Sequence, residues 1–248
     1  MRGQKEGESL QPLGGPGAVI VAAAHELKTP LTLISHISHI LADEALDLSA
    51  EEQARYVQRL QLVSQRSLRL IQQLTMSYRL QDAAQLAFAF ALQPVNMREV
   101  CETALHELTP YAREYRQELQ CALPMRPHMV VANRDILYDV VINLVDNAIR
   151  HNAPGSAVQL MTARRADRVR LHVHDTGEGI APSDITRLRR TMGRAPQPFS
   201  GHGATSGLGL YIAQQLAGAM GGRIGLGRAP QGTTFFVDLL HAKQLSLW

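Results

Sequence analysis

The sequence of 248 residues is poor in cysteine, in aromatic side chains and in net charge. Two cysteines are too few for a disulfide framework, and Cys101 and Cys121 lack the CxxC spacing of a metal or redox site, which favours a reducing cytoplasm. Aromatic residues make up 5% of the chain, and its 25 Lys and Arg are balanced by 22 Asp and Glu. Because the basic residues are not clustered, we expect no nucleic-acid partner.

Low-complexity segments and long apolar runs are also missing. With 45% hydrophobic and 19% charged residues, the chain is expected to fold around a substantial core. The first apolar run, residues 18–24, stops at His25 and is shorter than the ~20 residues that cross a bilayer. We therefore expect a cytoplasmic protein, either freestanding or the cytoplasmic part of a membrane-bound sensor whose anchor lies upstream.

Helical periodicity governs the first third of the chain. Residues 1–17, which hold five glycines and two prolines, are predicted to form a flexible leader. Residues 18–84 are predicted to form a hairpin of two helices, with Pro30 kinking the first and Ser49 beginning the second. A single hairpin cannot bury an apolar stripe on both helices, so we predict a homodimer that closes a four-helix bundle. The two stripes consist of Ile20, Ala24, Leu27, Leu31, Ile34, Ser38 and Leu41, and of Val57, Leu60, Ser64, Ser67, Ile71, Leu74 and Tyr78.

The period changes after about residue 85, where alternating patterns typical of strands are mixed with three helical stretches. Residues 85–242 are predicted to form a two-layer α/β sandwich with helices on one face of a sheet, followed by a tail at 243–248. Helices are predicted at 96–115, 133–151 and 207–220, and strands at 86–92, 158–163, 169–174, 223–227 and 233–239.

The segment HELKTPLT, residues 25–32, places a candidate nucleophile on the first helix. His25 follows the stripe position Ala24, which puts its ring at the edge of the bundle, and Thr29 one turn later shares its face. A nucleophilic imidazole needs one neutral nitrogen, and the carboxylate of Glu26 can hold the proton of the other. Taken alone, a His-Glu pair on a helix is more often a solvated surface pair.

The segment NLVDNAIRHN, residues 143–152, carries polar residues on a predicted apolar helix. Asn143, Asn147 and Arg150 share one face, while the apolar positions between them face the sheet. An asparagine carbonyl suits Mg²⁺ carried in by nucleotide phosphates, and an arginine pairs with those phosphates. An ordinary polar helix face is the alternative, although two asparagines lower the helix propensity of this segment.

Two glycine-rich segments lie at predicted strand and helix ends. In DTGEGI, residues 175–180, Asp175 suits an exocyclic amine, and Gly177 and Gly179 allow close backbone approach to a flat ring. The glycines of GHGATSGLGL, residues 201–210, allow backbone N–H groups to wrap an anion at a helix N-terminus. Each segment alone is also explained by a simple turn, and neither is a dinucleotide or P-loop motif.

Taken in order, HELKTPLT, NLVDNA, DTGEGI, GLGL and GTTF (232–235) resemble the catalytic core of the two-component sensor histidine kinases. The resemblance extends over about residues 18–240. It implies a dimerisation and phosphoacceptor hairpin followed by an ATP-binding domain of the Bergerat type. It further implies an ATP-dependent protein-histidine kinase that uses ATP and Mg²⁺ and that has the receiver domain of a response regulator as its partner.

The resemblance also implies roles for individual residues. His25 is the residue phosphorylated, Glu26 orients and deprotonates its imidazole, and Thr29 positions water when the regulator is dephosphorylated. Asn147 is the Mg²⁺ ligand, and Asp175 accepts the adenine amine. The other implied nucleotide contacts are Asn143 beside the metal site, Arg150 and His151 near the phosphates, Gly177 and Gly179 in the adenine turn, Gly203, Gly207, Leu208, Gly209 and Leu210 along the triphosphate, and Thr233 at the adenine.

One departure from the family pattern and one comparison with a related superfamily bear on the function. The aromatic box expected between DTGEGI and GLGL is replaced by ITRLRRTMGRAPQPF, and we expect residues 186–206 to be mobile without nucleotide. The alternative function is therefore a nucleotide-binding regulator or phosphatase-biased protein with little autophosphorylation. Hydrolysing ATPases of the wider superfamily resemble one another in a Glu four residues before the Mg-binding Asn, and Asn143 occupies that position here, which favours the kinase.

Overall fold

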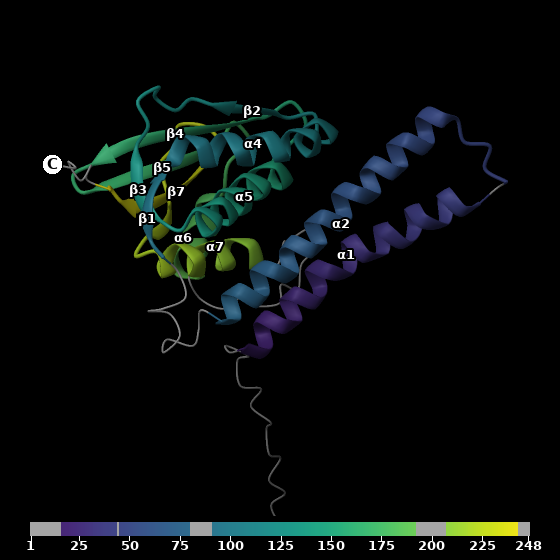
Figure 1. The fold of residues 1–248 in the computed structure, drawn as a ribbon, viewed down its shortest axis with the longest axis horizontal. Helices are drawn as coiled ribbons and strands as arrows, with labels where there is room; N and C mark the ends of the chain where they lie inside the picture. Colours follow the sequence, from purple (N-terminus) through teal and green to yellow (C-terminus); the bar gives the residue numbers. More distant parts are fainter. Residues whose placement is uncertain (1–15, 44, 80–90, 192–206, 243–248) are drawn as a thin grey trace, which may run out of the picture.

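The computed structural model describes residues 16–43, 45–79, 91–191 and 207–242. Two helices, α1 (Pro16–Ala42) and α2 (Ala50–Arg79), form an antiparallel hairpin whose loop end extends away from the rest of the molecule (Figure 1). Helix α1 continues on both sides of Pro30. By length and composition alone, Gly17–Ala42 also qualifies as a membrane span among the described residues, but here it packs against α2 and α7 (Leu208–Ala219).

The start of α2 follows the local chemistry predicted for Ser49. The Ser49 side chain accepts a hydrogen bond from the backbone N–H of Glu52 at 3.3 Å, and the Glu52 carboxylate accepts one from the Ser49 backbone N–H at 3.0 Å. This reciprocal arrangement is a capping box, which satisfies N–H groups that have no partner within the helix. The prediction that Ser49 begins the second helix is confirmed.

The second part of the chain is a two-layer α/β sandwich. Its sheet has the strand order β2 (Glu118–Cys121), β4 (Ala157–Arg165), β5 (Arg168–Asp175), β7 (Thr233–Leu240) and β6 (Arg223–Leu226), in which β2 pairs with β4 in parallel and the other pairs are antiparallel. The helices α4 (Met97–Glu114), α5 (Arg134–His151) and α7 cover one face of this sheet (Figure 1). A two-stranded sheet of β1 (Gln93–Asn96) and β3 (Met129–Ala132) and a further helix, α6 (Pro182–Thr191), complete the described part of the domain.

Alternation along the strands decides which face is covered. In β5 the side chains of Val169, Leu171 and Val173 are buried, while the residues between them are half-buried. The buried residues meet the apolar face of α5, where Leu144, Val145 and Ala148 are 4% exposed or less. The predicted sandwich, with helices on one face, is confirmed.

Several predicted elements need correction. Of the predicted strand 86–92, residues 86–90 lie outside the described residues and residues 91–92 are not in a strand; the first strand is β1 at Gln93–Asn96. The strands β2 and β3 were not predicted, because four residues are too few to establish an alternating pattern. Of the segment 186–206 that was predicted to be mobile, residues 186–191 belong to α6 and residues 192–206 lie outside the described residues, so its mobility stays a prediction.

The sheet is held together at one point by a buried carboxylate. Asp238 on β7 is 2% exposed and accepts two hydrogen bonds from Arg170 at 2.6 and 2.7 Å and one from Arg223 at 3.0 Å. The Arg170 guanidinium also stacks on the Phe236 ring at 3.7 Å. Burial alone would raise the pKa of Asp238, but the two arginines lower it below its usual range.

We expect Asp238→Asn to lower the free energy of unfolding by about 2–4 kcal/mol at pH 7, because it leaves the largely buried guanidinium of Arg170 without its anion. A carboxylate whose pKa is lowered by folding stabilises the folded state above its unfolded pKa and loses that effect as the pH falls through its folded pKa. Urea unfolding at pH 7 and at about pH 3 should therefore show a difference between parent and variant that shrinks with acid. Arg223→Gln, which leaves the Arg170 contacts in place, should cost less.

Candidate active site

The carboxylate of Asp175 lies at the end of β5, where this strand pairs with the start of β7. Asp175 is 5% exposed, and its Oδ1 accepts hydrogen bonds from the backbone N–H groups of Gly177 and Thr233, both at 3.1 Å. One N–H comes from the turn after β5 and the other from β7. Two backbone N–H groups therefore fix the position of the carboxylate.

The turn around Asp175 has no room for side chains at two of its glycines. A Cβ atom at Gly232 would lie 1.8 Å from the carbonyl oxygen of Asp175, and one at Gly177 would lie 1.8 Å from Oδ1 of Asn152. Gly232 also has a φ of +70°, a conformation that favours glycine. Thr233 and Gly177, both singled out from the sequence, are thus brought together with Asp175, and Gly179 (φ +81°) approaches the Gly232 carbonyl from the same turn.

The polar face of α5 carries the predicted asparagines. The Asn143 side chain donates to the carbonyl oxygen of Asp139 at 2.9 Å, and its Oδ1 lies 3.6 Å from where a Cβ of Gly209 would stand. The amide oxygen of Asn143 therefore faces the first turn of α7. Asn147, one turn later, is half-buried. At the end of α5, local burial and then the charge of Arg150 lower the pKa of His151.

The first turn of α7 follows the glycine-rich segment, as predicted. Gly207 precedes the helix with a φ of +68°, Leu208 is buried in the core, and Gly209 and Leu210 are half-buried. The N-cap residue Gly207 has no side chain to cap this helix start, and the N-terminus of a helix favours an anion. Gly203, the remaining predicted contact, lies outside the described residues.

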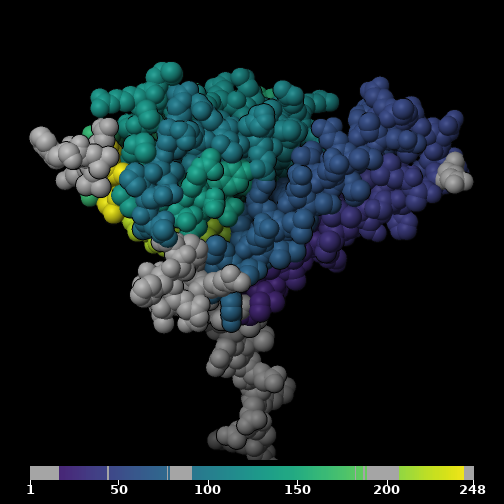
Figure 2. All heavy atoms as spheres, in the orientation of Figure 1, coloured from purple at the N-terminus to yellow at the C-terminus, as the bar shows by residue number. Residues whose placement is uncertain are grey.

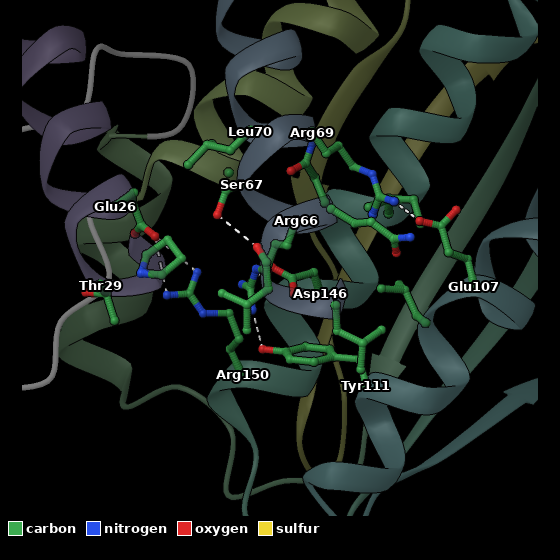
Figure 3. A pocket seen from close by; sticks show the side chains of 18 of the residues that line it. Glu26, Thr29, Arg66, Ser67, Arg69, Leu70, Glu107, Tyr111, Asp146 and Arg150 are labelled. Carbon is green, nitrogen blue, oxygen red and sulfur yellow. Dashed lines mark hydrogen bonds and ion pairs between the residues drawn. The ribbon is translucent and has the colours of Figure 1, made fainter. Parts of the chain in front are cut away.

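The three predicted hairpin residues lie on one turn of α1. His25 is exposed, and Glu26 is half-buried because it faces the α/β domain. Both terminal nitrogens of Arg150 lie 3.4 Å from Oε2 of Glu26. This ion pair joins the residue beside His25 directly to the polar face of α5, as Figure 3 shows.

A cavity of about 530 Å³ separates the hairpin from the α/β domain in this region. Its walls bring Glu26 and Thr29 of α1 together with Asn143, Arg150 and Gly209 of the α/β domain. Most of the other lining residues come from α2 and α4, and Figure 2 shows the hairpin lying directly against the domain. Predicted residues from three separate motifs thus share one cavity.

Sequence reasoning missed a second set of residues in this cavity. Arg66 of α2 pairs with Asp146 of α5 at 2.7 Å, donates a hydrogen bond to the hydroxyl of Tyr111 on α4, and lies 4.9 Å from the centre of the Tyr111 ring. These residues are separated by 45 and 80 positions, so no local motif could have linked them.

Comparison with known families assigns the two parts of the chain. Residues 19–83 match the His Kinase A (phospho-acceptor) domain, and residues 132–243 match the family described as histidine kinase-, DNA gyrase B- and HSP90-like ATPase. The chain belongs to the sensor histidine kinases. The sensor histidine kinase core therefore consists of an acceptor hairpin and an ATP-binding domain in one chain.

Curated relatives of this histidine kinase core are bacterial sensor proteins. It is 30% identical over 225 residues to the alginate biosynthesis sensor protein KinB of Pseudomonas aeruginosa, and 31% identical over 222 residues to the sensor protein kinase PmrB of the same species. It is 32% identical over 207 residues to the sensor protein SphS of Synechococcus elongatus. The matches cover 89%, 89% and 81% of this chain but only 36%, 44% and 48% of those proteins.

Solved structures share the fold of the kinase core. The Acinetobacter baumannii histidine kinase AdeS matches with a TM-score of 0.57 and 19% identity, over 88% of this chain and 98% of that one. Full-length ShkA in complex with AMPPNP matches with a TM-score of 0.55 and 24% identity, over 92% of this chain and 46% of that one.

We expect Gly232→Ala to weaken binding of a fluorescent ATP analogue and to lower the free energy of unfolding by about 1–3 kcal/mol, because it forces a Cβ against the Asp175 carbonyl in a strained backbone conformation. Gly218→Ala is the matched control, since no atom lies within 4 Å of that position and the glycine has no positive φ. Equal binding by the two variants would show that the Asp175 turn is not part of the nucleotide site.

Proposed function

We propose that this chain transfers the γ-phosphoryl group of Mg-ATP to His25. The observation that carries the proposal is the shared cavity, in which Glu26 and Thr29 of the acceptor turn face Asn143, Arg150 and Gly209 of the ATP-binding domain. Positioning supplies most of the catalysis in phosphoryl transfer, so the arrangement of these groups matters more than any single acid or base.

The nucleotide contacts are proposed from the chemistry of each group. Asp175, held by two backbone N–H groups, accepts the adenine amine, with Gly177, Gly179 and Thr233 around the ring. Gly207, Leu208, Gly209 and Leu210 present the first turn of α7 to the phosphates. Arg150 and His151 stand at the other side of the phosphates.

The amide oxygens of Asn143 and Asn147 suit a magnesium ion, because Mg²⁺ prefers oxygen ligands and usually binds together with substrate phosphates. Asn147 is the proposed ligand, with Asn143 beside it. When bound, the ion neutralises charge on the triphosphate. The Asn143 oxygen faces the α7 turn, which fits this role.

His25 and Glu26 carry the proposed chemical step. A neutral ring nitrogen of His25 attacks the γ-phosphorus, a nitrogen–phosphorus bond forms, and the bond to the bridging oxygen breaks as ADP leaves. Glu26 accepts the proton from the other ring nitrogen, so the product is an uncharged phosphorylated imidazole ring. Arg150 forms an ion pair with the same carboxylate at 3.4 Å.

The hairpin supports a homodimer. Apolar side chains on the predicted stripes remain exposed within one chain, among them Ile20 at 67%, Leu31 at 55% and Tyr78 at 71%. A second hairpin that covers these side chains would form the predicted four-helix bundle. We propose this dimer as the working form of the kinase in the cytoplasm.

The proposed partner is the receiver domain of a response regulator. His25 is exposed on α1, so an aspartate of a second protein has access to the phosphorylated ring. Thr29 is proposed to position water for dephosphorylation of that aspartate. The alternative of a regulator with little autophosphorylation rested on the segment before GLGL; its residues 192–206 lie outside the described part of the chain, and no described residue favours it.

Incubation with Mg²⁺ and γ-labelled ATP should give a label that is labile in acid and stable in alkali, as a phosphoramidate must be. His25→Ala should abolish the label while retaining ATP binding, and His36→Ala, an exposed histidine on the same helix, should retain both. ATP binding without label in the parent would overturn the kinase and favour the regulator.

Asp175→Asn should weaken binding of ATP by about tenfold, because a charge-assisted hydrogen bond contributes roughly 1.5 kcal/mol more than its neutral replacement. Titration with a fluorescent ATP analogue measures this effect without phosphoryl transfer. The control Asp167→Asn removes an exposed carboxylate elsewhere on the domain and should leave the affinity unchanged. Unchanged affinity in Asp175→Asn would contradict the adenine role.

A further inference from the structure

Helix α2 carries a row of polar residues that all find partners on the α/β domain of the same chain. Arg66 pairs with Asp146, Arg69 forms an ion pair with Glu107, and the Gln73 side chain donates to Asp139 at 3.2 Å. Arg66, Arg69 and Gln73 are three and four residues apart, so they share one face of the helix. The hairpin is therefore docked through a defined polar seam.

Arg66 is the centre of this seam. Its guanidinium contacts the Asp146 carboxylate at 2.7 Å and both the hydroxyl and the ring of Tyr111, as Figure 3 shows. The two charged side chains are 34% and 20% exposed, so the pair is largely shielded from water. Burial alone would lower the pKa of Arg66, but Asp146 and Tyr111 raise it. The contact is stronger than an ordinary surface ion pair.

The position of Asp146 makes this contact relevant to the reaction. Asp146 directly precedes Asn147 and lies one turn after Asn143 on α5. The contact that Asp146 makes with Arg66 of α2 therefore also fixes where the proposed metal-binding face lies relative to the hairpin. One turn further along α5, Arg150 reaches Glu26 of the same chain. The acceptor turn and the nucleotide face are therefore brought together by contacts within one chain.

We propose that the Arg66–Asp146 pair positions each ATP-binding domain on the hairpin of its own chain, so that the phosphoryl group moves to His25 within one protomer. The inference rests on the proposed function and adds the route of transfer and a positioning residue. Transfer between the two chains of a dimer would require these contacts to break or to form with the partner's hairpin instead. Transfer within one protomer thus requires Arg66 and Asp146 of the same chain to pair, whereas transfer between protomers requires Arg66 of one chain to pair with Asp146 of the other or requires the pair to be broken.

Charge reversal tests the positioning role. Arg66→Asp should lower the rate of His25 labelling at saturating ATP by about tenfold or more, since it places two carboxylates together. The KM for ATP should change by less than about twofold, because the guanidinium of Arg66 is engaged by Asp146 and Tyr111, which are not among the proposed nucleotide contacts. Arg55→Asp, the same change at an exposed position of α2, is the control and should leave both constants unchanged.

Rescue by the reversed pair separates the two routes. Arg66→Asp combined with Asp146→Arg on one chain should restore the labelling rate. A mixed dimer with one substitution on each chain should stay slow, because every intra-chain pair is then repulsive. Recovery in the mixed dimer would overturn the inference, since it requires pairing between chains. A faster rate in Arg66→Asp alone would overturn it too, because the contact would then restrain the reaction.

A second mixture avoids charge changes altogether. Tagged His25→Ala and untagged Asn147→Ala chains are refolded together, and dimers that contain both are isolated through the tag. The inference predicts no label on either chain, whereas label on the Asn147→Ala chain would overturn it and leave the kinase activity intact. Absence of label in the parent protein would instead reject the proposed function, and the inference with it.

Discussion

Helix α5 packs against the sheet with one face and against the hairpin and α7 with the other, and the rest of the site depends on this constraint. One face is buried against the sheet through residues such as Leu144 and Val145, both 0% exposed. The opposite face is polar and carries Asp139, Asn143, Asp146 and Arg150, which contact the hairpin or face α7. Because the apolar face fixes the rotation of the helix about its axis, the sheet determines where each polar residue points.

The pairing of β5 with β7 likewise fixes the position of a polar side chain, that of Asp175. Register places Asp175 opposite Thr233, so the N–H of Thr233 reaches the carboxylate without any side-chain adjustment. The adjacent glycines allow backbone segments to approach within distances that a Cβ would prevent. The carboxylate that we propose to recognise adenine is thus held by backbone contacts, and a group fixed in this way has a lower entropic cost of binding.

Features that depend on neighbours in sequence could be predicted, and features that depend on distant neighbours could not. The Ser49 cap, the polar face of α5 and the turn after β5 each arise from residues within a few positions of one another. The Arg66 contact joins α2, α4 and α5, and its residues carry no local pattern that distinguishes them from an ordinary charged helix face. How the hairpin docks on the α/β domain could therefore be learned only from the structure, although the sequence shows which polar residues each helix carries.

Three ion pairs between described residues connect the hairpin to the ATP-binding domain, and two of them, Arg66–Asp146 and Arg150–Glu26, differ in strength in a way that suits the proposed reaction. Arg66 and Asp146 meet at 2.7 Å with additional support from Tyr111, on the side of the cavity formed by α2 and α4. Arg150 and Glu26 are 3.4 Å apart, at the position where nucleotide phosphates are proposed to lie. Phosphates compete for Arg150 as doubly or triply charged ligands, so the weaker pair is the one that can exchange its partner. The stronger pair maintains the position of the domain while this exchange takes place, which separates docking from the handling of the substrate.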